Sequence, residues 1–198
     1  MIPVRGPRLV RRFTQLVAGL VVFGIGIGLI LQSDLGAPAW DVLHTGLAER
    51  FGLTVGSWTV IVSLVVILLW IPLREPYGIG TLLNGLLIGP SVDITLNFVD
   101  PPDSIAGDLT FLIGGIVLVG FATGMYIGAG LGPGPRDGLM TGLAKHGRSI
   151  RRSRTFVELG ALLAGVVLGG ELGWGTLLFA FGVGPVVQVF LPRWTVDV

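Results

Sequence analysis

Six long apolar stretches constrain the fold of this chain more than any other feature of its sequence. They cover residues 13–32, 55–73, 78–98, 109–130, 155–170 and 173–192. About 20 apolar residues are needed for a helix to cross about 30 Å of hydrocarbon, and the stretches are close to this length. Because lipid offers no partner to free backbone N–H and C=O groups, each stretch is expected to be a helix. The sequence therefore predicts an all-α membrane protein with six transmembrane helices.

The composition excludes most other classes of protein. Hydrophobic residues fill 52% of the 198 positions and charged residues only 13%, about half of the share in a soluble domain. This balance excludes intrinsic disorder, and the six stretches leave no room for a soluble catalytic domain, so residues 1–198 are expected to form a single transmembrane domain. The absence of cysteine excludes disulfides and thiolate chemistry. A formal net charge of +1 argues against nucleic acid as a partner.

The basic residues are divided unevenly between the two sides of the membrane. If the N-terminus is cytoplasmic, twelve of the 13 Lys and Arg residues lie in inside segments and only Arg50 lies outside. Basic loops stay in the cytoplasm, so we expect both termini to be cytoplasmic. A cleaved signal peptide is the alternative for the first stretch, because Ala37-Pro38-Ala39 resembles a cleavage site. The apolar run of about 20 residues is long for a signal peptide, however.

Two blocks of sequence recur, which indicates an internal duplication. LGAPAWDVLHTGLA at 35–48 aligns with LGPGPRDGLMTGLA at 131–144, with eight identities in fourteen positions. GIGTLLNGLLIGPSV at 78–92 aligns with GWGTLLFAFGVGPVV at 173–187, with eight identities in fifteen. The repeats, about 13–98 and 109–192, each hold three spans, an odd number, so the second is expected to enter the membrane upside down. Inverted-topology repeats are common in transporters but are not confined to them.

A short segment follows the first span of each repeat, at 39–51 and at 135–147. Segments of 10–14 residues are too short to cross a bilayer and are typical of interfacial or re-entrant helices. Both start with the helix-breaking sequences LGAP and LGPGP, which could dip inward, and both end in charged residues that should face water. The sequence leaves the interfacial and the re-entrant arrangement open.

The duplicated blocks resemble the YczE/YitT-type family of bacterial integral membrane proteins. The resemblance is carried by LGAPAWDVLHTGL, by LGPGPRDGLM, by the pair Arg154 and Glu158, and by GWGT. Because the chain stops after the sixth span, it is similar to the short YczE form, without the soluble C-terminal domain of YitT-type members. The resemblance implies a multi-pass protein of the bacterial inner (plasma) membrane and implies no substrate.

Four charged residues in the second repeat are candidates for a path through the membrane. Arg136 and Asp137 lie at the start of the short segment, where a helix N-terminus and an arginine could bind an anion, although Arg136 could also be an ordinary cytoplasmic residue. Arg154 and Glu158, spaced i, i+4, form either a helix ion pair near the headgroups or part of a functional site, since carboxylates inside a membrane are costly. We expect these four residues to form one compensated network.

Two further carboxylates are candidates for the same path. Asp41 matches Asp137 in the repeat, and both are either helix caps or ligands for an ion, a proton or a substrate. Asp93, in the third span, could line the path, pair internally or be solvated. Thr81 and Thr176, at the starts of the third and sixth spans, are expected to bond their own helix backbone rather than a ligand.

The remaining residues indicate packing rather than chemistry. Glycines recur every four residues, as at Gly120, Gly124, Gly128 and Gly132, which lets helices approach closely and could support a homo-oligomer. His44 and His146 are single residues on the short segments and do not form a metal cluster. We expect no metal and no cofactor.

The leading functional hypothesis is a small-solute or ion transporter or channel, with its path between the repeats. Its expected partners are the lipid bilayer and an unknown small solute or ion. The alternative is a non-transporting membrane scaffold or accessory subunit whose glycine-rich faces bind a partner. An enzyme is not expected, because no set of nucleophile and base is visible in the sequence.

Overall fold

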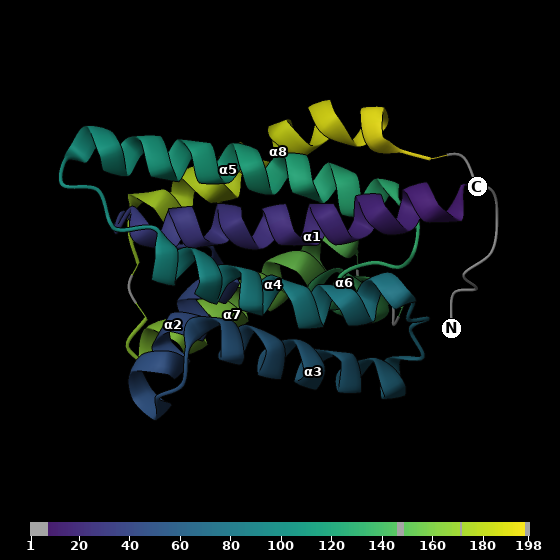
Figure 1. Ribbon diagram of the computed structural model, residues 1–198. Coiled ribbons are helices and arrows are strands. Elements are labelled where there is room, and N and C mark those ends of the chain that lie inside the picture. Colours follow the sequence, from purple (N-terminus) through teal and green to yellow (C-terminus); the bar gives the residue numbers. More distant parts are fainter. Residues whose placement is uncertain (1–7, 146–148, 171, 197–198) are drawn as a thin grey trace.

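Eight helices make up the part of the chain that the structure describes. This computed structural model describes residues 8–145, 149–170 and 172–196, and no strand occurs among them. The helices are α1 (Leu9–Gln32), α2 (Ala39–Phe51), α3 (Val55–Leu73), α4 (Ile79–Phe98), α5 (Ile105–Gly128), α6 (Pro135–Lys145), α7 (Ile150–Val167) and α8 (Trp174–Trp194) (Figure 1). Their order, six long helices and two short ones, is the order expected from the sequence. His146 and the basic residues Arg5 and Arg148 lie outside the described residues.

Five of the long helices are long and apolar enough to cross a membrane: α1, α3, α4, α5 and α8. Helix α7 is not among them, although a span was expected at 155–170. It begins at Ile150, before the apolar run, and therefore carries three arginines and Glu158 in its first half. The stretch after the last arginine, 155–167, is roughly 20 Å long at 1.5 Å per residue. That length is shorter than the hydrocarbon core of about 30 Å.

The helices pack in two groups around two apolar cores. Figure 1 shows α5, α1, α4 and α3 following one another across the bundle, and α8 packs on the far side of α5. The larger core lies between α1, α4 and α5 and contains fully buried residues such as Leu16, Leu20 and Leu112. The smaller core is built around Trp40, Trp70 and other residues of α2, α3, α6 and α7. The two short helices therefore lie inside the bundle, each in contact with both α3 and α7.

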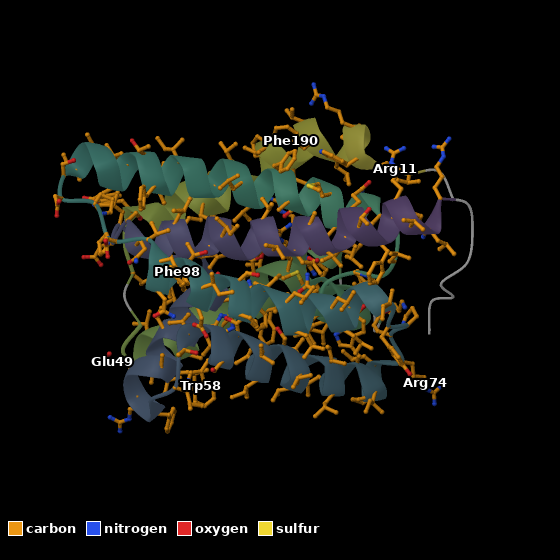
Figure 2. The ribbon with its side chains drawn as sticks, viewed as in Figure 1. Arg11, Glu49, Trp58, Arg74, Phe98 and Phe190 are labelled. Atoms are coloured by element: carbon orange, nitrogen blue, oxygen red, sulfur yellow. The ribbon has the colours of Figure 1, made fainter. Side chains whose placement is uncertain are left out.

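The two ends of the bundle differ in charge. Figure 2 shows Arg11 and Arg74 at one end and Glu49 at the other. We call the first the basic end. There the ammonium group of Lys145, at the end of α6, lies 2.8 Å from a carboxylate oxygen of Glu75, which follows α3. Helices α2 and α6 therefore end at opposite ends of the bundle.

Side chains at both ends of α1 bind the C-terminal ends of the neighbouring helices α5 and α4. At the basic end Arg12 is almost fully buried, and its guanidinium donates to the carbonyl oxygens of Ala129 (2.7 Å) and Gly130 (2.9 Å). At the opposite end the amide of Gln32 donates to the carbonyl oxygens of Leu96 and Val99. These carbonyl oxygens lie at or just after the C-terminal ends of α5 and α4, where no further helical turn supplies an N–H donor. Arg12 also adds positive charge where the α5 dipole is negative.

Two backbone hydrogen bonds cross between the halves of the chain in a reciprocal way. The N–H of Gly80, at the start of α4, donates to the carbonyl oxygen of Leu131 at 2.9 Å, and the N–H of Gly175, at the start of α8, donates to that of Leu35 at 2.6 Å. Leu35 aligns with Leu131 in the sequence repeat, and Gly80 aligns with Gly175. The start of the last helix in each half is thus bonded to the turn before the short helix of the other half.

The same two turns require glycine for steric reasons. Gly36 and Gly132 have φ angles of 106° and 128°, in a region that residues with a Cβ rarely adopt. A Cβ at Gly36 would lie 2.5 Å from the backbone of Gly173, and a Cβ at Gly132 would lie 2.9 Å from the Cα of Gly78. The Leu-Gly pair common to both sequence blocks therefore allows both the turn and the close contact with the neighbouring helix start.

The halves differ in how their last two helices are arranged. Helices α3 and α4 pack closely at Gly56 and Gly89, where a Cβ on either glycine would overlap the carbonyl oxygen of the other. Within the described residues, α7 and α8 make no extended contact. The residues that match Gly56 and Gly89 in the second half are Arg152, which is exposed, and Gly184, around which an added Cβ would meet no atom. An arginine in place of a glycine removes the close approach.

The substitutions Gly89→Ala and Gly184→Ala test this difference at matched positions. A methyl group at 89 would overlap the Gly56 carbonyl, and overpacking of this kind costs about 1–3 kcal/mol. At 184 the methyl group has free space, and alanine favours the helix by up to about 1 kcal/mol. We expect the thermal unfolding midpoint of the purified protein in detergent to fall for G89A and not for G184A. Equal shifts would contradict the asymmetric packing.

Candidate functional site

The two short helices meet with their N-termini facing each other inside the bundle. The Nη2 atom of Arg136, second residue of α6, lies 3.8 Å from Oδ1 of Asp41 in α2. The guanidinium carbon of the same arginine lies 5.1 Å from the centre of the Trp40 ring, second residue of α2. Trp40 and Arg136 are aligned in the sequence repeat. We call this meeting point, formed by Trp40, Asp41, His44, Arg136 and Asp137, the helix junction.

Asp41 and His44 form a buried polar pair on one face of α2. Asp41 is 2% exposed and His44 is 0% exposed. The Nδ1 atom of His44 lies 3.2 Å from Oδ1 of Asp41 and 3.1 Å from Oγ1 of Thr59 in α3. A carboxylate only accepts hydrogen bonds, so the proton between the pair belongs to Nδ1. In the neutral imidazole this leaves Nε2 as an acceptor.

Three polar atoms of the helix junction are buried without a hydrogen-bond partner among the described residues. They are Oδ2 of Asp41, Nε2 of His44 and Nε1 of Trp40. Arg136 also donates no hydrogen bond to any described residue, since its contacts are the 3.8 Å approach to Asp41 and the Trp40 ring. Buried polar groups are normally satisfied, and exceptions often mark a site for water, an ion or a ligand. The helix junction therefore has unused donors and unused acceptors side by side.

Asp137 occupies the position in α6 that Asp41 occupies in α2, but it has a different partner. Its Oδ2 atom accepts a hydrogen bond of 3.0 Å from the hydroxyl group of Tyr126 in α5. Asn84 of α4 lies close to the same turn, because its amide nitrogen and Oδ2 of Asp137 are the atoms nearest to a Cβ built at Gly134. The charge of Arg136 thus acts on two carboxylates, Asp41 from the first half and Asp137 from the second.

The surroundings of the two aspartates shift their pKa values in opposite directions. Both residues lie in short helices, outside the candidate spans. Burial raises the pKa of Asp41, but the charge of Arg136 and the hydrogen bond from His44 outweigh it, and the net pKa is lowered. Burial also raises the pKa of Asp137, and Tyr126 and Arg136 compensate only in part. The pKa of His44 is lowered, mainly by burial, which favours its neutral form.

Arg154 and Glu158 lie apart from the helix junction. Nε of Arg154 is 3.2 Å from Oε1 of Glu158, and the two side chains are 64% and 37% exposed. They form an ion pair along the surface of α7, while Arg136 reaches across to Asp41 in the other half. The structure therefore divides the four residues Arg136, Asp137, Arg154 and Glu158 between two places. Only a long-range electrostatic effect of Arg154 on Asp137 connects them.

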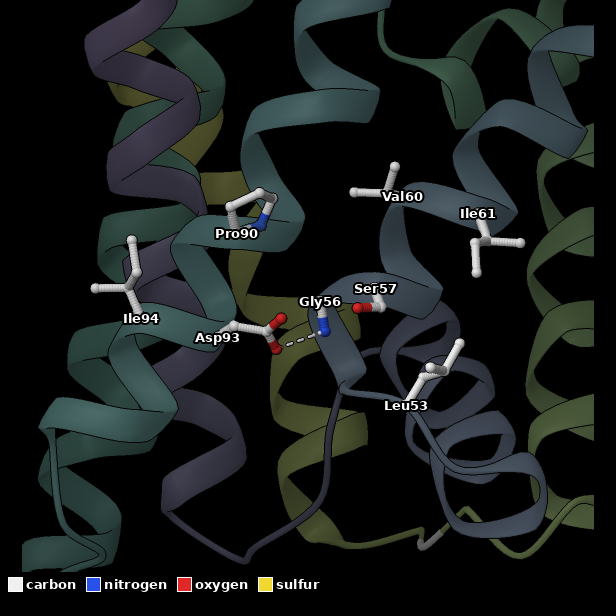
Figure 3. Close-up of a pocket in the computed structure, with 8 residues that line it drawn as sticks. All are labelled: Leu53, Gly56, Ser57, Val60, Ile61, Pro90, Asp93 and Ile94. Atoms are coloured by element: carbon white, nitrogen blue, oxygen red, sulfur yellow. Dashed lines mark hydrogen bonds between the residues drawn. The ribbon is translucent and has the colours of Figure 1, made fainter.

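Asp93 holds the start of α3 against α4 and lines a groove on the surface (Figure 3). One of its carboxylate oxygens accepts from the Gly56 N–H at 2.8 Å, and the other accepts from the Thr54 hydroxyl group at 2.5 Å. The groove is otherwise mostly apolar, with Leu53, Val60, Ile61, Pro90 and Ile94 among its lining residues. A carboxylate at a helix N-terminus satisfies free N–H groups and complements the dipole.

The two threonines at helix starts are used in backbone hydrogen bonds. Oγ1 of Thr81 accepts from the Gly78 N–H at 3.2 Å and donates to the carbonyl oxygen of Pro133 at 2.8 Å. Oγ1 of Thr176 accepts from the Gly173 N–H at 3.4 Å. Thr81 therefore also connects α4 to the turn that precedes α6.

Several residues of the site cannot be singled out from the sequence pattern. His44 stands there as an isolated histidine, although its i, i+3 spacing from Asp41 places both side chains on one helix face. Trp40 falls on an apolar face of its segment. Tyr126 and Thr59 carry no local signal, because their partners are separated from them by 11 and 15 residues. Their roles follow from tertiary packing alone.

The geometry of the helix junction resembles neither a metal centre nor a catalytic triad. No group of three or more His, Asp or Glu side chains able to hold a metal occurs among the described residues. Both partners of His44, Asp41 and Thr59, lie at Nδ1. In a Ser-His-Asp triad the two partners use the two different ring nitrogens.

An all-helical bundle with five apolar candidate spans and a buried polar site is an integral membrane protein. Residues 10–192 match a family described as "Family of unknown function (DUF6198)". The chain belongs to this family, and its YczE-like character is confirmed. No solved structure matches it.

Three relatives from two bacteria show the extent of the similarity. An uncharacterized protein of Haemophilus influenzae is 41% identical over 177 residues, which cover 89% of this chain and 81% of the relative. The uncharacterized membrane protein YczE of Bacillus subtilis is 38% identical over 189 residues, covering 93% and 87%. YyaS of the same organism is 33% identical over 182 residues, covering 88% and 89%. The similarity extends over almost the whole chain in each case.

The substitutions Asp41→Asn and Asp137→Asn should affect stability differently at pH 7. A carboxyl group with a lowered pKa stabilises the fold above its ordinary range, and this contribution is lost as the pH falls through the folded pKa. Replacement of Asp41 removes it, with a loss of about 1–3 kcal/mol for a buried charged hydrogen bond. A group with a raised pKa destabilises the fold as the pH rises through the folded value. Asp137→Asn removes this cost, and its amide oxygen still accepts from Tyr126.

We therefore expect the thermal unfolding midpoint in detergent to fall for Asp41→Asn and to stay the same or rise for Asp137→Asn. The deficit of Asp41→Asn relative to the wild type should persist down to the ordinary pKa range of Asp and become smaller only as the pH falls below it, toward the lowered pKa of the folded state. If the two variants lose the same stability, the opposite environments of the two carboxylates are not supported.

Proposed function

We propose that the protein is a transporter or channel for a small solute or ion, built from two inverted repeats of three spans each. The observation that carries the proposal is the helix junction, a set of buried ionisable side chains where two short helices converge from opposite ends of an apolar bundle. Ionisable groups inside a membrane are expensive and usually serve function. Opposed helix N-termini at mid-bundle are a recurring feature of transporter sites.

Several contacts support inverted repeats. The hydrogen bonds Gly80 to Leu131 and Gly175 to Leu35 are exchanged when the halves are exchanged. The contacts between helices follow the same exchange. Helix α2 packs on α7 as α6 packs on α3, and α4 packs on α1 as α8 packs on α5. Aligned residues such as Trp40 and Arg136 touch each other, which is expected of residues beside a pseudo-twofold axis.

A sixth span at α7 is part of the proposal. In the arrangement of the other five spans, α2 and α6 end at opposite ends of the bundle. Helix α7 follows α6 in the chain and packs on α2, so it has to run from one end of the bundle to the other. The far part of α7 packs on α2, where a Cβ at Gly165 would meet the backbone of Val42 and Leu43. Its near part carries the arginines, which can reach the lipid headgroups while their stems cover apolar surface. The short apolar length of α7 is thereby compensated by long side chains at its start.

The alternative of a scaffold is less favoured because the glycine-rich faces are used inside the chain. A Cβ at Gly120, Gly124 or Gly128 would meet residues of α8, and a Cβ at Gly24 or Gly28 would meet residues of α4. These faces bring helices of the same chain together, which leaves a scaffold without its expected docking surface. A homo-oligomer would have to use other surfaces.

We also propose that the basic end faces the cytoplasm of a bacterial inner membrane. Single cysteines at Asp103 and Arg151 test this topology, since the natural chain has no cysteine. An impermeant maleimide added to intact cells should label position 103 and should label position 151 only after the membrane is permeabilised. Labelling of both positions in intact cells would exclude six spans with this orientation.

Osmotic swelling of proteoliposomes tests transport of many solutes in parallel. Vesicles with the purified protein are mixed with isosmotic solutions of small sugars, amino acids and salts, and light scattering reports solute entry. We expect faster entry than in empty vesicles for at least one solute, and a loss of at least about tenfold in rate for Arg136→Ala, because the buried carboxylate of Asp41 loses the cation that faces it.

The matched control is Glu158→Gln, which changes an exposed charge outside the helix junction and should retain the rate. Both variants have to reach wild-type levels in the membrane fraction. If all solutes enter wild-type and empty vesicles equally fast, while a partner protein copurifies in fixed stoichiometry, the scaffold alternative is correct.

A further inference from the structure

The helix junction is rich in positive potential and in unused hydrogen-bond donors. Each helix N-terminus carries the equivalent of roughly half a positive charge, and the N-termini of α2 and α6 face each other. Between them lies the guanidinium of Arg136, which donates no hydrogen bond to any described residue and lies over the ring of Trp40, whose Nε1 is buried and unpartnered. These groups together favour an anion with oxygen acceptors.

The charge that now balances Arg136 comes from Asp41, but the contact between them is loose. The closest approach of 3.8 Å is longer than a charge-assisted hydrogen bond, which is normally about 2.7–2.9 Å. Only Oδ1 of Asp41 faces the arginine, while Oδ2 is buried without a partner. An incoming anion that forms hydrogen bonds with the guanidinium can therefore displace this contact at low cost.

Displacement of the arginine would leave Asp41 as an isolated charge in a site that is 2% exposed. Buried carboxylates without a compensating cation take up a proton instead of remaining ionised. From these contacts we infer that the helix junction binds one small monovalent oxyanion, such as a carboxylate or nitrate, together with one proton. The anion is held by Arg136 and the indole N–H of Trp40, and the proton adds to Asp41.

The charge of the site is unchanged in this exchange. Before binding, the guanidinium is balanced by the Asp41 carboxylate. After binding, it is balanced by the anion, and Asp41 is a neutral carboxylic acid. The proton adds to a carboxylate oxygen of Asp41, and no covalent bond is broken. Anion and proton therefore increase each other's affinity, and the inference names both the substrate class and the coupling ion of the proposed transporter, on which it rests.

The groups around Asp41 include one other unpartnered acceptor, Nε2 of His44, and the lowered pKa of His44 disfavours a proton there. On its own helix Asp41 faces His44, whose Nδ1 proton is already shared with it, and from α6 it faces Arg136. Helix α3 contributes the neutral Thr59 through His44, and the backbone at Gly165 of α7 and at Gly170 packs against the neighbouring Val42 and Leu43. The arginines of α7 are exposed on its surface, and the side chain of Glu158 is 37% exposed.

Of Arg136, Asp41 and His44, only Arg136 is partly exposed to the outside. The side chain of Arg136 is 25% exposed, in contrast to the fully buried Asp41 and His44. An anion can therefore reach the guanidinium first, and the proton follows to the buried carboxylate. The planar guanidinium suits two oxygens of one group better than a spherical halide.

Proton uptake on anion binding tests the inference directly. Purified protein in detergent is kept in a weakly buffered solution at pH 6.5 with a soluble pH indicator, and potassium nitrate or potassium lactate is added, with potassium chloride and sulfate as controls. We expect uptake of up to one proton per chain with nitrate or lactate and much less with the controls. Uptake should be lost in Arg136→Gln and in Asp41→Asn, and kept in Glu158→Gln, which changes an exposed charge outside the helix junction.

Binding and proton uptake can be separated by fluorescence. The Trp40 ring lies under the guanidinium, so anion binding should change the emission of the wild type and not of Trp40→Phe. Asp41→Asn should retain this change while it takes up no proton. If Asp41→Asn shows neither response although it elutes as a folded protein, or if nitrate causes no proton uptake in the wild type, the inference is wrong.

A transport measurement distinguishes the inference from the proposed function. Vesicles with an internal pH dye are given an inward nitrate gradient with the membrane potential clamped. Internal acidification in the wild type, with nitrate entry but no acidification in Asp41→Asn, supports both. Proton uptake in detergent without transport of any solute would overturn the transporter and keep the anion and proton site. Transport of a cation or a neutral solute without nitrate-dependent proton uptake would overturn the site and keep the transporter.

Discussion

The structure depends on how backbone groups are satisfied where the chain breaks its helices inside an apolar bundle. Lipid and apolar side chains offer them no partner, so every break needs a protein acceptor or donor nearby. At the breaks before α2 and α6, the carbonyl oxygens of Leu35 and Leu131 accept hydrogen bonds from the N–H groups of Gly175 and Gly80. These two glycines lie at helix starts of the opposite half. This exchange keeps two short helices inside the bundle, and the short helices in turn bring Asp41 and Arg136 together.

The fold is predictable to the extent that it is encoded locally. Apolar length defines the long helices, and the Leu-Gly turns and their prolines define the starts of the short ones, because helix-breaking residues act at the position where they stand. The sequence leaves the re-entrant arrangement open, since it depends on contacts between residues far apart in the chain, such as Gly80 with Leu131 and Gly175 with Leu35. Helix α7 also shows the limit: its three arginines begin inside the helix, whereas hydropathy alone places its start after them.

The site is predictable only in part, for a related reason. Duplication singles out Asp41 and Asp137, and the glycine–proline context singles out Arg136. The partners of these residues cannot be read from the chain, because repeated residues need not have repeated neighbours. Arg136 contacts the first half and not Glu158, and Asp137 accepts from a tyrosine whose matching position in the first half is Ile30. Equivalent carboxylates thus have different chemistry because their surroundings diverged.

The difference between the halves has an energetic consequence. If each half could adopt the arrangement of the other at no cost, the molecule would have two conformations of equal free energy. In this chain, such an exchange would pack α7 on α8 in the way that α3 packs on α4. Arg152 would then occupy the contact position of Gly56, and a guanidinium is difficult to accommodate against a helix in apolar surroundings. The chain is therefore biased toward one resting shape. If the chain alternates between two shapes as proposed, the opposite shape would have to be stabilised by a ligand that binds it preferentially.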